Sequence, residues 1–523
     1  NYTRQRKKLT RRYKNYLYLS ILSLFSFLIN YHYSMIGINA MDNFVLYNGG
    51  YRVLNGFVPF NDYWLITGPL LDYLNSFFFY IFGVNWKSFI YHSSIFNLII
   101  SVSTYLLLVS LNLRKEWSLF YSLLFSILMY PVVGTPFVDH HSTIFLLLSF
   151  YIFIYCIKKE NYIYFCTIPF LMVLSFLSKQ TPASYGIVGI IILYGIFSYL
   201  NKEFFVKTFL YFFYGSIFSF IFLILFFVFT SINFEEFFSQ YILFAKNVGS
   251  YRFSLFNLNL HDIHEYKFLL FNLIFVVIFL IYSFRENNKK SMIILSGVFL
   301  INVILIFHQK LTSNQNYIFF LIPLTMSFIH LNYEKYFPKK KFILLTLILI
   351  CLLGSIKYHL RFNENRKFND LEKVDLKKAL SADVIDESLR GLKWITKVYP
   401  DDPEREIENL KEAMEIIKKN NKKKAIITSY QFIAPALGIY DYSPNQWHHP
   451  SVSFPLEGQK YFLKYKSYFI ANLKKNNIQG IYTVGIGEEN IPSLILDKSC
   501  YQKKKLGEFV FHYELLNDCD DFK

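Results

Sequence analysis

The sequence has few cysteines and none of the cysteine spacings that mark zinc domains. Its five cysteines are scattered along 523 residues, with no Cys-x-x-Cys pair. Cys156, Cys166 and Cys351 fall in hydrophobic segments, where cysteine behaves as a small apolar residue. Cys500 and Cys519 lie near the C-terminal end, and they either pair in an oxidising compartment or stay free.

Charged residues are also scarce, at 17% of the chain, whereas 54% is hydrophobic and the mean hydropathy is +0.29. Soluble globular proteins rarely carry that much apolar surface. The apolar residues form runs of roughly 17–25 residues between short polar breaks, which is the length that crosses a bilayer core of about 30 Å. These features exclude an ordinary soluble protein and predict a protein embedded in a lipid bilayer.

We predict an all-α membrane bundle of eleven spanning helices, followed by a soluble α/β domain. The boundaries follow the polar breaks between apolar segments. The predicted spans are residues 16–35, 88–112, 117–134, 142–157, 163–178, 184–200, 208–230, 268–284, 292–308, 317–333 and 342–358. Long outer loops are expected at 36–87 and 231–267.

The formal net charge of +17 would fit a nucleic-acid partner, but the placement of the charges favours a membrane topology signal. Alternate breaks between the spans are basic. They contain Arg114-Lys115, Lys158-Lys159, Lys202 and Lys207, Arg285 with Lys289-Lys290, and Lys335 with Lys339-Lys340-Lys341. The positive-inside rule places these breaks and the basic residues 1–15 in the cytoplasm of a multi-pass inner or plasma membrane protein. An odd number of spans then places residues 359–523 outside, and no nucleic-acid partner is expected.

The C-terminal tail, residues 359–523, has the pattern of a small α/β domain. Residues 402–422 form an amphipathic helical pattern that begins at Asp402-Pro403. Apolar segments at 425–429 and 480–484 predict buried strands, with a second helix at 459–474 between them. This order predicts a parallel βαβ unit, and it contains no glycine-rich phosphate-binding loop.

The first outer loop carries the most distinctive residues. Asp42 follows the first span, and Asp62 follows a turn at Asn55-Gly56 and Pro59. Asp42 can be interpreted in two ways: as an ordinary helix N-cap, or as a general base held beside the membrane. The spacing alone leaves both readings open.

The order of several short motifs resembles that of the GT-C membrane glycosyltransferases that use polyprenyl-phosphate sugars, the branch of protein mannosyltransferases and aminoarabinose transferases. The residues that carry the resemblance are Asp42, Tyr47, Tyr51, Gly56–Asp62, Pro69, Leu74 and Phe82-Gly83, then Pro131–Asp139, Ser178-Lys179-Gln180, and His308, Lys310 and Tyr317 with Pro323. Two positions depart from the family pattern. Asn43 stands where the family often has Glu, and Gln180 stands where it usually has Gly.

The resemblance implies transfer of a sugar from a polyprenyl-phosphate carrier to an envelope glycan, lipid or protein on the extracytoplasmic face. It implies Asp42 as the base and Asp139 as a second catalytic residue that orients Asp42 or the acceptor. Cations should stabilise the leaving phosphate. The side chains expected to bind phosphate or substrate are Lys179, Lys310, Arg52, Tyr51, Asp62, His308 and Tyr317.

No cofactor is expected, although Asp139-His140-His141 raises the alternative of a divalent metal. Adjacent histidines do not share a helical face, which argues against that alternative.

Loop 231–267 is either a lid or a solvated loop, and Trp447–Pro450 is either a packed loop or part of an acceptor site. The rival functions are an O-antigen ligase or polymerase, and a transporter or flippase. The predicted spans contain almost no ionisable groups, since Lys357 lies at a span end and His330 lies near the cytoplasmic edge. This scarcity counts against a transporter.

Overall fold

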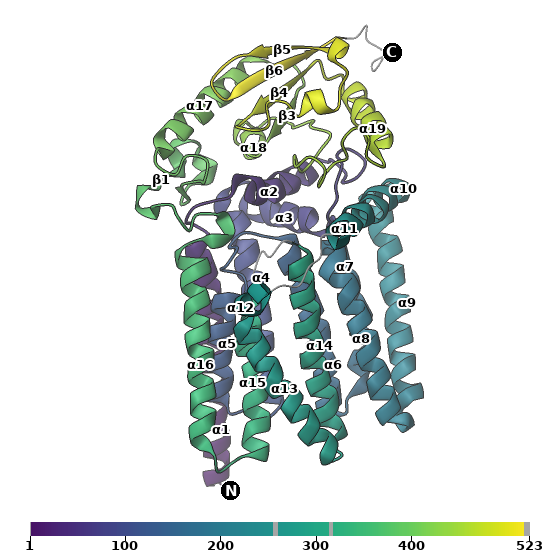
Figure 1. Ribbon diagram of the computed structural model, residues 1–523, viewed down its shortest axis with the longest axis vertical. Helices are drawn as coiled ribbons and strands as arrows, with labels where there is room; N and C mark the ends of the chain where they lie inside the picture. Colours follow the sequence, from purple (N-terminus) through teal and green to yellow (C-terminus); the bar gives the residue numbers. More distant parts are fainter. Residues whose placement is uncertain (1, 255–259, 313–316, 517–523) are drawn as a thin grey trace.

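The computed structural model describes residues 2–254, 260–312 and 317–516, and most of these residues lie in helices. A bundle of long helices forms one end of the molecule, and a domain that contains a β-sheet forms the other (Figure 1). Every predicted span overlaps a helix of the bundle. The bundle helices are α1 Tyr2–Tyr33, α4 Trp86–Ser110, α5 Lys115–Leu128, α6 Val138–Lys159, α7 Ile168–Ser178, α8 Gln180–Leu200, α9 Phe205–Thr230, α13 Lys267–Arg285, α14 Lys289–Leu311, α15 Leu321–Tyr336 and α16 Lys341–His359.

Seven helical segments in the described part of the chain are long and apolar enough to cross a membrane, and they contain α4, α6, α8, α9, α13, α14 and α16. In contrast, α5, α7 and α15 have 14, 11 and 16 residues. These three are shorter than the about 20 residues that a membrane crossing requires. The structure therefore supports a membrane protein, while the number of eleven spans stays a prediction.

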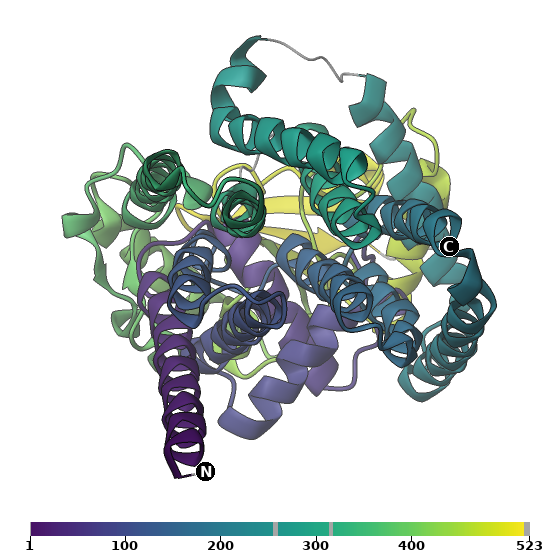
Figure 2. The ribbon, with the colours of Figure 1, turned by 90° about the horizontal axis from the view of Figure 1, so that it is seen from below.

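The outer surface of the bundle is apolar, as a lipid environment requires. In α9, which lies at the rim of the bundle in the view from below (Figure 2), Phe220 and Phe229 are 63% and 82% exposed. The turns that join α13 to α14 and α15 to α16 lie at the same end as the N-terminus, opposite the tail (Figure 1). Because basic residues lie in or beside both turns, this arrangement follows the pattern from which the topology is predicted.

Two helices of the first outer loop, α2 Ala40–Leu54 and α3 Leu70–Phe82, lie between the bundle and the tail (Figure 1). They pack closely because α2 contains the pair Gly49-Gly50. A Cβ at Gly50 would lie 2.5 Å from the Cβ of Asn75, and one at Gly49 would lie 2.2 Å from Oδ1 of Asp72. A larger residue at either position would push α3 away from α2.

The tail contains a four-stranded sheet in the order β3-β4-β6-β5, with β3 Ala425–Thr428, β4 Gly480–Val484, β5 Tyr501–Lys505 and β6 Val510–Leu515. Strands β3 and β4 are parallel, as the predicted βαβ order requires. The predicted helices are present as α17 Pro403–Lys419 and α19 Phe462–Lys475, and a short helix, α18 Ile433–Leu437, follows β3. Two two-residue strands, β1 Leu380–Ser381 and β2 Lys393–Trp394, precede α17. Strands β5 and β6 were not predicted. Cys500 is buried and disulfide-bonded. Its predicted partner, Cys519, lies outside the described residues, so the identity of the partner stays a prediction.

A buried polar seam fastens the tail to α2. The Arg52 guanidinium pairs with Asp441 and also donates a 3.1 Å hydrogen bond to the carbonyl oxygen of Asn445. Asn48, one turn earlier on α2, donates to the same carboxylate of Asp441 at 2.9 Å. Because Arg52 and Asp441 are 1% and 3% exposed, neither charge is solvated, and each depends on the other.

Candidate functional site

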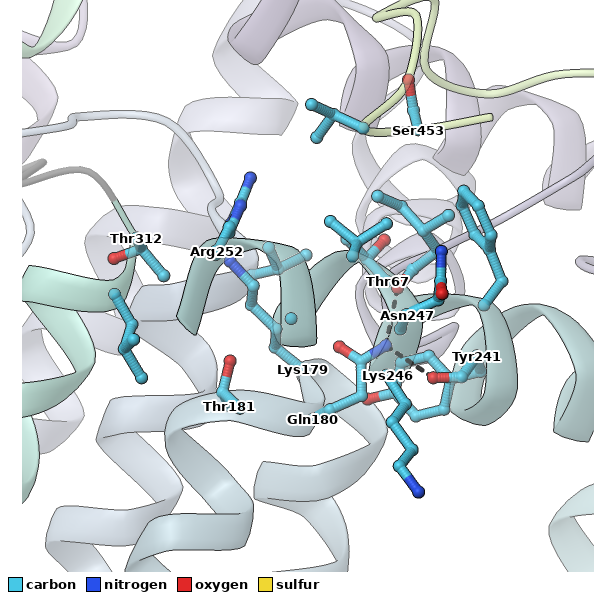
Figure 3. Close-up of a pocket in the computed structure, with 18 of the residues that line it drawn as sticks. Thr67, Lys179, Gln180, Thr181, Tyr241, Lys246, Asn247, Arg252, Thr312 and Ser453 are labelled. Atoms are coloured by element: carbon cyan, nitrogen blue, oxygen red, sulfur yellow. Dashed lines mark hydrogen bonds between the residues drawn. The ribbon is translucent and has the colours of Figure 1, made fainter. Parts of the chain in front are cut away.

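A cavity of about 1370 Å³ lies where the bundle, the first outer loop and the tail meet. The ends of α6, α7, α8 and α14 form its floor, α2 and α11 Ala245–Ser254 form its walls, and tail residues 447–460 contribute its roof. Figure 3 shows Lys179 and Thr181 at the end of the bundle, Arg252 on α11, and Ser453 above them. The predicted site residues that line the cavity are Asp42, Asp139, Lys179 and His308.

Asp42 lies in the first turn of α2 and is not its N-cap, which is Asn39. The side chain of Asn39 donates a 3.0 Å hydrogen bond to Oδ2 of Asp42. Asn43 fixes the start of this helix, since its Oδ1 accepts from the Asn39 amide at 2.8 Å and its Nδ2 donates to Thr135 at 2.8 Å. The departure from the family pattern at Asn43 thus ties α2 to the segment that precedes α6.

Burial raises the pKa of Asp42 to about 6 from the ordinary value of 3.8, because the enclosed carboxylate loses hydration. Asp370 and Asp139 raise this pKa further, and the nearby ammonium groups of Lys397 and Lys179 oppose the shift. A carboxyl group with a pKa near neutrality is well suited to accept a proton during a reaction.

Asp139 is fully buried in the first turn of α6 and is paired on both oxygens. Lys179 Nζ donates to Oδ2 at 2.6 Å, and His308 Nε2 lies 3.0 Å from Oδ1. These three residues come from α6, the α7–α8 junction and α14, so the pairing joins three parts of the bundle. The contacts hold Lys179 and His308 at the cavity, and they make Asp139 a positioning group in this structure.

The local sequence explains why Lys179 reaches the cavity. Helix α7 ends at Ser178, and Lys179 has an extended backbone with φ −159° and ψ 141°. Thr181 is also extended, as expected for a residue that precedes a proline, here Pro182. The break in the helix turns Lys179 towards Asp139 instead of along the membrane.

Gln180 connects two outer loops beneath the cavity. Its Nε2 donates to the carbonyl oxygens of Ile66, at 2.8 Å, and Tyr241, at 2.7 Å (Figure 3). A glycine here, as in the family pattern, would lack both hydrogen bonds. The substitution therefore fixes the first outer loop against the segment that leads into α11.

Helix α11 adds positive charge to the cavity. The described residues of loop 231–267 form α10 Phe234–Phe237, a π-helical turn at Phe238–Phe244, α11 and α12 Leu260–Glu265. Lys246 and Arg252 on α11 line the cavity, and neither forms an ion pair with another described residue. With Lys179 and the roof residue Lys460, the lining carries four basic side chains, against the two carboxylates Asp42 and Asp139.

The other predicted site residues do not line the cavity. Arg52 belongs to the seam with the tail, and Tyr51 donates to the Ile439 carbonyl oxygen at 3.3 Å. Asp62 accepts from the Val58 amide at 2.7 Å and pairs with Lys475 at 2.7 Å. Lys310 pairs with Asp262 at 2.7 Å, and Tyr317 is buried with its ring 4.6 Å from that of His140.

The two adjacent histidines of α6 have separate partners. His140 Nε2 lies 3.0 Å from the Met129 carbonyl oxygen, whereas His141 Nε2 lies 2.9 Å from Nε2 of His92. His92 belongs to α4, inside the predicted span 88–112. The expectation that the spans contain almost no ionisable groups is therefore wrong at this position. His141 also contacts Tyr130, and His92 contacts Asn75, at 2.6 Å each, so all four groups are satisfied.

Several residues of the cavity carried no clear signal in the sequence. From the sequence, Lys246 and Arg252 are indistinguishable from solvated loop residues. In the structure, α11 brings both to the lining of the cavity. Trp447 and His449 line the roof, far along the chain from Asp42, and no spacing rule connects the two segments. In comparisons with known proteins, no family model matches the sequence, and no curated protein matches it.

Proposed function

We propose that this chain is a membrane glycosyltransferase that moves a sugar from a polyprenyl-phosphate carrier to an envelope acceptor on the extracytoplasmic face. The observation that carries the proposal is the convergence of Asp42, Asp139, Lys179 and His308 on one cavity. These four residues come from four separate parts of the sequence, in α2, α6, the α7–α8 junction and α14. Residues that serve only to cap separate helices are not expected to line the same cavity.

The charges of the cavity suit the proposed chemistry. Asp42 accepts the proton of the acceptor hydroxyl as that oxygen attacks the anomeric carbon of the sugar. The bond from the anomeric carbon to the phosphate oxygen breaks, and the phosphate leaves with the bonding electrons. Lys179 and Arg252 stabilise the negative charge that collects on this phosphate. Inversion at the anomeric carbon follows from the family resemblance alone.

The proposed base is tested with Asp42→Asn, which keeps the shape of the side chain and removes its ability to accept the proton. The full chain is expressed in cells, and polyprenyl-phosphate sugars are extracted from the membranes and quantified by mass spectrometry. We expect the lipid-linked donor to accumulate and the modified acceptor to disappear. Asp401→Asn is the matched control, because Asp401 is 89% exposed on the tail. Transfer at the wild-type rate by Asp42→Asn would overturn the assignment.

An O-antigen ligase-like enzyme is the second candidate, because His308 and Arg252 also line the cavity and such enzymes rely on outer arginine and histidine side chains. The same experiment separates the two candidates. A ligase of that kind would keep its activity in Asp42→Asn and lose it in Arg252→Met. The proposed glycosyltransferase would lose most of its activity in Asp42→Asn.

A further inference from the structure

The cavity is larger than one ligand requires. Pockets for a single small ligand usually enclose about 300–1000 Å³, and this cavity encloses about 1370 Å³. A sugar phosphate at Asp42 and Lys179 would leave the upper part of the space open. The roof above that space belongs to the tail and differs in chemistry from the floor.

The roof combines an aromatic ring, hydroxyl and amide groups, and positive charge. The tail residues that line it are Trp447, His449, Ser451, Val452, Ser453, Gln459 and Lys460. No acidic side chain belongs to this lining among the residues that the structure describes. Aromatic faces and hydrogen-bonding groups suit a sugar ring, and Lys460 suits an anionic substituent.

The charge balance of the whole cavity also favours an anionic second ligand. The four basic side chains exceed the two carboxylates, and Asp139 already pairs with Lys179. One sugar-phosphate donor carries a single negative charge, which would leave the lining with excess positive charge. A second anion would offset this excess, and Lys246 and Lys460, which are exposed and form no ion pair with another described residue, can bind it.

We propose that the roof of tail residues 447–460 is the acceptor subsite and that the acceptor is an anionic glycan, a sugar that carries a phosphate or a carboxylate. This inference rests on the proposed function, since it assigns the second substrate of the same cavity. Trp447 packs against the sugar, and Lys460 binds its negative group. The roof is held in place by Gln446, whose side chain donates to both oxygens of Asp72 at 3.0 and 3.1 Å.

The test uses the full chain in lipid nanodiscs and ligand-observed NMR. Glucose, galactose and mannose are each compared with their 6-phosphates and uronic acids, and undecaprenyl phosphate is titrated separately. We expect at least one anionic sugar to bind about tenfold more tightly than its neutral parent, as one charge-assisted hydrogen bond provides. Lys460→Met should abolish this preference and leave the affinity for undecaprenyl phosphate unchanged. Lys411→Met is the matched control, because Lys411 is exposed on α17 and does not line the cavity.

Two further outcomes are informative. Trp447→Ala should weaken every sugar that binds, whereas Trp117→Ala, a change at a tryptophan outside the cavity lining, should not. Equal binding of neutral and anionic sugars, or an anionic preference that survives Lys460→Met, would overturn the inference. A failure of undecaprenyl phosphate to bind the wild-type chain would instead count against the proposed function, since the sugar titrations are independent of it.

Discussion

Lys179 Nζ lies 2.6 Å from Oδ2 of Asp139, and both side chains line the cavity. Asp139 is fully buried, and Lys179→Met would leave His308 as the remaining partner of the Asp139 carboxylate. We therefore expect this variant to lower the free energy of unfolding by about 3 kcal/mol. Thermal unfolding in detergent measures this change. The double variant Lys179→Met with Asp139→Leu should regain most of the stability but not the affinity for undecaprenyl phosphate. Recovery of that affinity would show that Lys179 does not bind phosphate.

The raised pKa of Asp42 predicts how activity depends on pH. A base must be deprotonated, so kcat/KM should rise with pH and reach half of its plateau at about pH 6. Initial rates of sugar transfer between pH 4.5 and 8.5 provide the profile. Asp42→Asn should show neither the plateau nor this acidic limb. An acidic limb near pH 4 in the wild type would contradict Asp42, with its raised pKa, as the base.

The same raised pKa predicts that the stability of the fold falls as the pH rises, whereas the activity rises. A carboxyl group whose pKa is raised by folding favours the protonated folded state, so its stabilising contribution is complete below pH 3.8 and is lost as the pH rises through about 6. Asp42→Asn should therefore unfold at a higher temperature than the wild type at pH 8, and at the same temperature below pH 4. Equal unfolding temperatures at pH 8 would mean that Asp42 is solvated.

Arg52 is predicted to hold the tail and not the substrate. Arg52→Met should leave Asp441 buried without its partner and destabilise the junction by about 3 kcal/mol. Limited proteolysis between the bundle and the tail should then become faster. The double variant Arg52→Met with Asp441→Leu should restore protease resistance and retain sugar transfer. A stable but inactive double variant would favour the substrate-binding role that the family resemblance implies.

Gln180→Ala removes two hydrogen bonds that join the outer loops. Each is worth about 1 kcal/mol, so the unfolding free energy should fall by about 2 kcal/mol. Because these bonds hold the segment that leads to α11, KM for the lipid donor should rise more than kcat falls. Ser184→Ala, a change at another cavity-lining residue of α8, is the control. A pure loss of kcat would indicate a direct role in the chemistry.

The sequence predicts the bundle and half of the tail well, because those elements depend on local pattern. Apolar runs predict every bundle helix. Helix α17 is predicted by Asp402, its N-cap, and by the apolar residues of one helical face, which are buried: Ile407, Leu410, Met414 and Ile417. Strand β5 is different. Its sequence Tyr-Gln-Lys-Lys-Lys is mostly exposed and has no apolar pattern, and it is a strand because it pairs with β6.

The sequence predicts the floor of the site and Asp42 in the wall that α2 forms, but not the rest of the site. Asp42, Asp139, Lys179 and His308 were found from the order of motifs, although no spacing rule places them together. Arg52 and Lys310 have the right charge, but Asp441 and Asp262 engage them, and these ion pairs are tertiary contacts. The contributions of α11 and the roof depend on how distant segments fold over the bundle, which residue type and spacing do not encode.

The central claim is that the phosphate of a lipid carrier binds in the cavity beside Asp42 and Lys179. Electron cryo-microscopy of the full chain in nanodiscs with undecaprenyl phosphate tests it directly. We expect phosphate density in hydrogen-bonding contact with Lys179 or Arg252, and next to Asp42. Lipid phosphate bound only outside the cavity, with the space beside Asp42 filled by solvent, would contradict the account.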